Sequence, residues 1–262
     1  MDEYAAQLSR LLRQRVGGFF HNTLRDPQRT CSVCYGPKGS GDLCHRCAEH
    51  RAEFGPRLAD DVVILTYVRG RQASESIHQS AHTVRAYKQS PPARKCAEDM
   101  ALMVHAATVI HGECIEKTSG SAWSAVTFVP SRSRPGPIHP VAELARQVSR
   151  NNDAQNRLLL DVAAGFETPP DRTVRADRFE VPSKYADRVN GRHVLLIDDT
   201  WTSGAKVQSA AVALHDAGAK TVTALCVARW CRDNWPDHKE LLDMCTAPYD
   251  ALVCPVTGGP CS

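Results

Sequence analysis

The sequence predicts an α/β fold with a doubly wound, mainly parallel sheet and a small N-terminal zinc-binding module. Three observations predict it. Short β-branched and apolar runs alternate with longer helical stretches from residue 61 onward, one of these runs leads through two acids into a hydroxyl-rich turn, and two Cys-x2-Cys pairs stand near the start. Such alternation is typical of βαβ units, in which successive strands lie parallel.

The individual elements follow from periodicity and from residues that end helices. Strands are predicted at 62–68, 124–130, 193–199 and 221–228. Helices are predicted at 4–16, 45–55, 93–111, 140–165 and 205–217, the last closed by Gly218. The proline-bearing, charged stretch 167–184 is predicted to be a mobile loop or flap. Beyond residue 230 the pattern is too weak to assign.

These elements divide the chain into four segments. We expect an amphipathic N-terminal helix in 1–30, a four-cysteine zinc module in 31–56, an α/β core in 57–229 and a C-terminal segment of uncertain structure in 230–262. The N-terminal helix is expected to pack against the body of the protein rather than on a membrane.

Composition narrows the class of protein. The 262 residues are 42% hydrophobic and 23% charged, as in soluble globular proteins. The formal charge of +3 is too small to imply a nucleic-acid partner without a local patch. No apolar run is long enough to span a membrane, and the charged start lacks the pattern of a secretory signal. We therefore expect a cytoplasmic protein with no membrane partner.

The strongest functional signal is the passage from a strand into a helix around Asp198 and Asp199. A parallel strand ends where ligands bind, and the following helix start presents free amides to an anion. The hydroxyls of Thr202 and Ser203 add donors, Gly204 permits close approach, and the acids accept hydrogen bonds from ribose hydroxyls. The alternative is a plain turn with a helix cap.

The stretch VLLIDDTWTSGAK, 194–206, resembles the phosphoribosyl-pyrophosphate (PRPP) binding signature of type I phosphoribosyltransferases. The resemblance implies a phosphoribosyltransferase-like core in which the two acids are catalytic and engage the ribose, while 200–204 hold the 5′-phosphate. The PRPP-binding residues would be Asp198, Asp199, Thr200, Trp201, Thr202, Ser203, Gly204 and Ala205. Trp201 departs from the family pattern, which usually has a smaller aliphatic residue there.

The two cysteine pairs, Cys31 with Cys34 and Cys44 with Cys47, enclose a turn-rich stretch of nine residues. Four thiolates at this spacing can surround one structural zinc ion and leave no open position for a substrate. A redox pair, or His45 in place of one cysteine, stays open as an alternative.

A zinc module in front of a PRPP loop resembles the arrangement of the ComF-like family, which is associated with competence and DNA uptake in bacteria. The family commonly carries an Arg-Gly-Phe-Asn-Gln type stretch where this chain has SRSRPGPIHPVAEL. The sequence departs from the family pattern there.

Basic and hydroxyl residues after the second predicted strand are candidates for binding pyrophosphate, because VTFVPSRSRPG resembles the pyrophosphate loop of this fold. The candidates are Ser131, Arg132, Ser133 and Arg134, together with Lys88. A basic surface turn and a snorkelling lysine are the plainer interpretations. Four flap residues that could neutralise pyrophosphate are each expected to be solvated charges: Arg172, Arg175, Arg178 and Lys184.

Two further groups of residues are expected to be structural. His139 has no paired nucleophile or metal spacing, so we expect it in the core or on the surface. The cysteines near the end of the chain are irregularly spaced and are expected to be ordinary thiols rather than a second metal site. They are Cys231, Cys245, Cys254 and Cys261.

The resemblance implies an enzyme of nucleotide metabolism that binds PRPP with Mg²⁺ and transfers its phosphoribosyl group to a nitrogen acceptor, releasing pyrophosphate. Two alternatives remain. One is a non-catalytic adaptor in DNA uptake, in which a basic run between Arg10 and Arg29 would touch single-stranded DNA or a helicase partner. The other is a PRPP-sensing regulator without turnover. A homodimer is left open.

Overall fold

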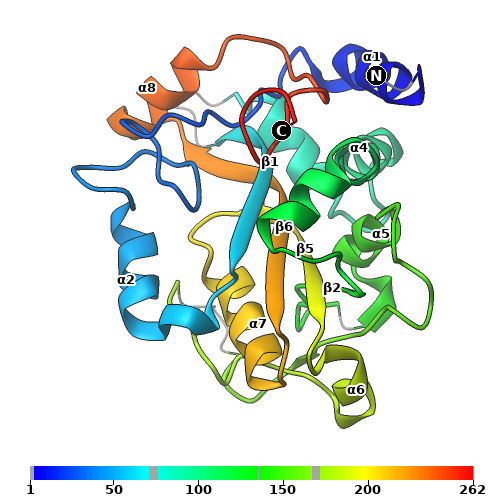
Figure 1. The fold of residues 1–262 in the computed structure, drawn as a ribbon. Helices are drawn as coiled ribbons and strands as arrows, with labels where there is room; N and C mark the ends of the chain where they lie inside the picture. Colours follow the sequence, from blue (N-terminus) through cyan, green and yellow to red (C-terminus); the bar gives the residue numbers. More distant parts are fainter. Residues whose placement is uncertain (1–2, 71–75, 135, 167–171, 262) are drawn as a thin grey trace.

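The structure is a computed structural model that describes residues 3–70, 76–134, 136–166 and 172–261 (Figure 1). Its helices are α1 (Glu3–Val16), α2 (His45–Phe54), α3 (Gln79–Ala86), α4 (Arg94–Thr118), α5 (Pro140–Arg146), α6 (Ala186–Val189), α7 (Ala205–Asp216) and α8 (Pro236–Met244). Its strands are β1 (Asp61–Gly70), β2 (Ala125–Phe128), β3 (Asp161–Val162), β4 (Phe179–Glu180), β5 (His193–Trp201) and β6 (Thr221–Arg232). In these ranges no helix combines the length and the apolar character that crossing a membrane requires.

A four-stranded parallel sheet forms the centre of the molecule, in the order β1-β6-β5-β2. Each neighbouring pair runs parallel, with β5 between β2 and β6. Consecutive parallel strands need a crossover connection, and the helical stretches between them supply it. The predicted α/β class and its four strand positions are confirmed.

Side-chain alternation along β5 divides the core into two halves. Leu195 and Ile197 point to one face and join the hydrophobic cluster formed with α1, α4 and α5. Val194 and Leu196 point to the other face and pack with α7 and the cysteine module. Because both faces are covered, β5 is apolar from Val194 to Ile197, just before the acids at its carboxyl end. The sheet is therefore doubly wound, as predicted.

The N-terminal helix α1 packs on α4 rather than standing apart. Leu12 and Val16 are fully buried in the core, and Arg15 forms a 2.5 Å ion pair with Asp99 of α4. Ser9 donates a 2.8 Å hydrogen bond to Asp250, which lies near the other end of the chain. Both ends of the chain therefore meet on the same side of the molecule (Figure 1).

The predicted helix over 140–165 is wrong beyond Arg146. Asn151 adopts a left-handed conformation with φ of 48°, which a helix does not tolerate. The side-chain amide of Asn152 then donates to the carbonyls of Ala145 and Val148, at 3.0 and 2.9 Å. These bonds satisfy carbonyls at the helix end and stop it there. In contrast, α4 continues to Thr118, past the predicted end at residue 111.

The predicted flap over 167–184 is described only from residue 172 onward. This part contains β4, which pairs antiparallel with β3. Arg178 is 0% exposed and donates a 2.8 Å hydrogen bond to the carbonyl of Thr173, so the expected solvated charge is wrong for this residue. Its guanidinium instead holds the segment against α7, where Ser209 lies 3.4 Å away.

We predict that Leu12→Ala lowers the free energy of unfolding by about 2–5 kcal/mol, because it leaves a cavity between α1 and α4. Leu11 is 40% exposed on the same helix. Leu11→Ala therefore serves as the matched control and should change stability by less than about 0.5 kcal/mol. Urea unfolding of both variants measures the difference. Equal stability of the two variants would show that α1 does not pack as described.

Candidate active site

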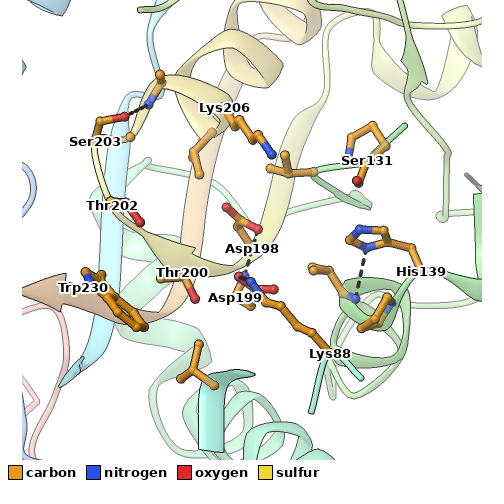
Figure 2. Close-up of a pocket in the computed structure, with 18 of the residues that line it drawn as sticks. Lys88, Ser131, His139, Asp198, Asp199, Thr200, Thr202, Ser203, Lys206 and Trp230 are labelled. Carbon is orange, nitrogen blue, oxygen red and sulfur yellow. Dashed lines mark hydrogen bonds and ion pairs between the residues drawn. The ribbon is translucent and has the colours of Figure 1, made fainter. Parts of the chain in front are cut away.

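A pocket of about 720 Å³ opens at the carboxyl ends of β5 and β6 (Figure 2). It is the place where a doubly wound sheet ordinarily binds its ligand, because the loops after neighbouring strands diverge there. Its walls come from the β5–α7 turn, the end of α3, the loop after β2, the start of α5 and the end of β6. With Arg172, from the segment before β4, one cavity thus collects residues from six separate parts of the chain.

The two acids at the end of β5 differ in their surroundings. Asp199 is buried and accepts a 2.7 Å hydrogen bond from Lys88 Nζ and another from the Tyr87 hydroxyl. Burial alone would raise the pKa of Asp199, but the Lys88 ammonium and these hydrogen bonds outweigh it and lower that pKa. Asp199 is therefore an anion that is already paired.

Asp198 stays partly exposed to the pocket, and one of its oxygens accepts a 2.9 Å hydrogen bond from the Asp199 amide. Burial, followed by the negative charge of Asp199, raises the pKa of Asp198 to about 8. The two adjacent carboxyl groups therefore differ in protonation at neutral pH: Asp198 is mostly protonated, whereas Asp199 is ionised.

The turn between β5 and α7 forms a cradle closed by Gly204. This glycine has φ of 82°, and a Cβ on it would lie 2.2 Å from the Trp201 ring. Trp201 is buried beneath the turn and does not line the pocket, whereas Thr200, Thr202 and Ser203 do. The unusual tryptophan therefore supports the loop from below.

Helix α7 begins immediately after this cradle, at Ala205. The first amides of a helix have no acceptor within it and carry the positive end of its dipole. The Ser203 hydroxyl sits 3.4 Å from the Ala205 amide. The cradle and the helix start together offer the donors that a phosphate needs.

Basic side chains outnumber acids around the pocket by six to two. The basic residues are Arg85, Lys88, Arg134, Arg172, Lys206 and Arg232, and the acids are Asp198 and Asp199. Low-dielectric walls concentrate the field of such a cluster. The pocket is therefore electrostatically suited to an anion with several negative charges.

The loop after β2 contributes three of its four candidates to the pocket. Ser131, Ser133 and Arg134 line it. Arg132 instead lies over the Phe166 ring, with its guanidinium carbon 5.6 Å from the ring centroid. Lys88, predicted as a candidate or a surface lysine, lies at the pocket against Asp199.

Sequence reasoning missed several residues of the site, among them Tyr87, which contacts Asp199 from behind the wall, and His139 and Trp230, which line the pocket. His139 caps α5, with its Nδ1 accepting a 3.2 Å hydrogen bond from the Val141 amide, and it lines the pocket. Burial lowers the pKa of His139 to about 4, so its ring is neutral. Of these, only Tyr87 had a signal, its place next to Lys88.

The four predicted cysteine ligands converge in the N-terminal module. The sulfur atoms of Cys31, Cys34, Cys44 and Cys47 all lie within 4.8 Å of one another. The Cys34 and Cys44 sulfurs are 3.7 Å apart. Tetrahedral zinc with Zn–S bonds of about 2.3 Å has an edge of about 3.8 Å between sulfurs, so the cluster fits this ion. His45 pairs with Glu49 outside the cluster.

Arg229 connects this cysteine cluster to the turn between β5 and α7. It is buried, and Nη1 donates to the carbonyls of Trp201 and Thr202 at 3.2 and 2.7 Å. Burial would lower the pKa of Arg229, but the negative charge of the cysteine thiolates, Cys34 first, raises it. A Cβ on Gly36, inside the module, would lie 2.7 Å from this guanidinium. One cation therefore contacts both the module and the loop.

The basic run considered for DNA is largely engaged within the chain. Arg15 pairs with Asp99 at 2.5 Å, and Arg29 with Asp26 at 3.7 Å. Arg25 stacks over Tyr35, 3.6 Å from the ring centroid. Arg10 and Arg13 of the same run are exposed on α1, so the DNA surface stays a prediction.

Among solved structures, the chain is similar to a phosphoribosyltransferase from Corynebacterium diphtheriae. The two share 19% sequence identity, the similarity covers 57% of this chain and 91% of that chain, and the TM-score is 0.26. No protein-family model matches the chain, and no curated protein matches it.

We predict that Arg229→Met lowers the free energy of unfolding by about 3–5 kcal/mol, because it removes the cation from a buried charge cluster. It should also speed amide hydrogen exchange at 201–204, since two loop carbonyls lose their donor. Arg188→Met is the matched control, as Arg188 donates to the Arg157 carbonyl outside the pocket. If exchange in the loop matched that of the control, Arg229 would not hold the cradle.

Proposed function

We propose that this chain binds PRPP as its Mg²⁺ complex and transfers the phosphoribosyl group to a nitrogen acceptor, releasing pyrophosphate. One observation carries the proposal: a single pocket is lined by two acids, a hydroxyl-lined helix start and six basic side chains. PRPP has two ribose hydroxyls, a 5′-phosphate and a pyrophosphate, which match these three groups. The four-cysteine module, proposed as a structural zinc site, supports the loop through Arg229.

The ligand would lie across the cradle. Its 5′-phosphate would accept hydrogen bonds from Thr202, Ser203 and the first amides of α7. Its ribose hydroxyls would donate to Asp198, whose partly exposed side chain faces the pocket. Asp199 is already paired with Lys88, so its role is to hold that lysine at the pocket rather than to take both hydroxyls.

The pyrophosphate would lie toward the loop after β2, where Arg134 and the two serines line the pocket. During transfer the bond from ribose C1 to the pyrophosphate oxygen breaks, and its electron pair leaves with pyrophosphate. The acceptor nitrogen forms the new bond to C1 and loses a proton. Lys88 and Arg134 would stabilise the departing charge, and ionised Asp198 would balance the positive charge that develops on the ribose.

The resemblance to ComF-like proteins rests on the same two features, the cysteine module and the loop, and we extend it to this chain as part of the proposal. A PRPP sensor is the second candidate. The pairing of Asp199 and the raised pKa of Asp198 are compatible with ligand binding alone and do not require turnover. Pyrophosphate release across a panel of nucleobases distinguishes the two. Release with one base supports the enzyme, whereas tight binding without release supports the sensor.

We predict that Asp198→Asn lowers PRPP affinity by about 10- to 100-fold, because hydrogen bonds to a charged group contribute about 1.5–3 kcal/mol. Calorimetric titration in the presence of Mg²⁺ measures it. Asp187→Asn, a change at an exposed residue of α6, is the control and should bind as the wild type does. Unchanged affinity in Asp198→Asn would overturn the assignment of this residue.

We also predict that PRPP binding releases a proton at pH 7. The affinity for PRPP should rise between pH 6.5 and 8.5, by about 100-fold at most. The reason is the raised pKa of Asp198, about 8, since the ionised carboxylate accepts hydrogen bonds from ribose hydroxyls more strongly than the neutral carboxyl does. Calorimetry in buffers of different ionisation enthalpy counts the proton. In Asp198→Asn, the proton from residue 198 should no longer be released on binding. The protons exchanged by the phosphates of the ligand itself should be counted as before. The same proton count in both proteins would contradict the prediction.

A further inference from the structure

A second cluster of metal-ligating side chains lies where the last residues of the chain fold against α4. The ligand atoms of His111, Cys254 and Cys261 all lie within 4.8 Å of one another. His111 Nδ1 is 3.1 Å from the Cys261 sulfur. His111 and Cys254 are buried, whereas Cys261 is exposed. The fold thus brings together residues from α4 and the C-terminal segment, about 140 positions away.

A fourth ligand follows from α4 itself. Cys114 stands three residues after His111, and residues at this spacing lie on the same face of a helix. His111 lies within 4.8 Å of the Cys254 and Cys261 sulfurs, so a thiol one turn further along the same face of α4 is next to this group. With Cys114 as the fourth member, the group would hold three sulfurs and one imidazole nitrogen, which is a ligand set of structural zinc sites.

The two ring nitrogens of His111 have the partners that are typical of a metal-bound histidine. Its Nε2 lies 2.7 Å from the carbonyl oxygen of Ala251. Because a carbonyl only accepts, Nε2 carries the proton and the lone pair of Nδ1 points at the thiols. Metal-bound histidines almost always donate their second ring nitrogen to such an acceptor, which fixes the tautomer and the ring.

The backbone between the two C-terminal cysteines forms a compact turn. The Cys254 amide donates to the Gly259 carbonyl, and the Gly258 amide donates back to the Cys254 carbonyl, both at 2.8 Å. Gly258 has φ of 78°, a left-handed conformation that favours glycine. This turn returns the chain so that Cys261 lies beside Cys254.

The geometry points to a second structural zinc site, formed by His111, Cys114, Cys254 and Cys261, that fastens the C-terminal segment to α4. Thiolates with an imidazole favour zinc over hard cations such as Mg²⁺. Four protein ligands leave no open position, so the role is structural rather than catalytic. The inference is independent of the proposed PRPP chemistry and of the four-cysteine module.

Zinc content of the purified full chain, measured by elemental analysis after dialysis, tests the site. The expected value is two zinc ions per chain. The double variant C254S/C261S should retain one ion, and so should C31S/C34S in the other cluster. Cys96→Ser is the matched control, because Cys96 is a buried cysteine of α4 outside both clusters, and this variant should retain two.

X-ray absorption at the zinc edge of the wild-type chain provides a test that needs no variant to fold. Two sites predict one nitrogen ligand for every seven sulfur ligands, with Zn–S near about 2.3 Å and Zn–N near about 2.0 Å. One zinc per chain with sulfur ligands alone would overturn the inference. A disulfide that includes Cys114, Cys254 or Cys261, found by mass spectrometry of the unreduced protein, would overturn it as well.

Discussion

The buried guanidinium of Arg229 is the contact on which the arrangement of this molecule depends. It lies between the sulfur cluster and the β5–α7 turn and donates to the carbonyls of Trp201 and Thr202. Four thiolates around a divalent ion carry net negative charge, and a buried charge is tolerated only when it is paired. The same guanidinium contacts the module at Gly36 and supplies donors to the loop, which couples the position of one to that of the other.

The loop is held from two further directions. Trp201 fills the space beneath Gly204, which has room for no Cβ, and α7 begins directly after it. On the pocket side, Lys88 and Tyr87 hold Asp199 in place. A site that must bind a highly charged ligand is more effective when its donors are arranged before the ligand arrives, because reorganisation then costs little.

The C-terminal segment packs against α1 and α4. Asp250 accepts from Ser9 and from the Leu252 amide, and His111 of α4 donates to Ala251. These contacts join α1, α4 and the end of the chain into one packed unit. Tyr249 and Ala251 of this segment belong to the hydrophobic core, so the described part of the segment packs on the body of the molecule (Figure 1).

Local sequence determined the positions of the four strands, the turn from β5 into α7 and the spacing of the four cysteines, because each depends on residues that are neighbours in the chain. The order β1-β6-β5-β2 joins strands that are far apart in the sequence and depends on tertiary packing. Only the tertiary structure decided the rest. Arg178 is buried, the helix after Pro140 ends early, and His111 meets Cys254 and Cys261 because folding places distant residues together. The spacing of residues along the chain does not predict such contacts, because tertiary packing determines which side chains of separate elements lie close together.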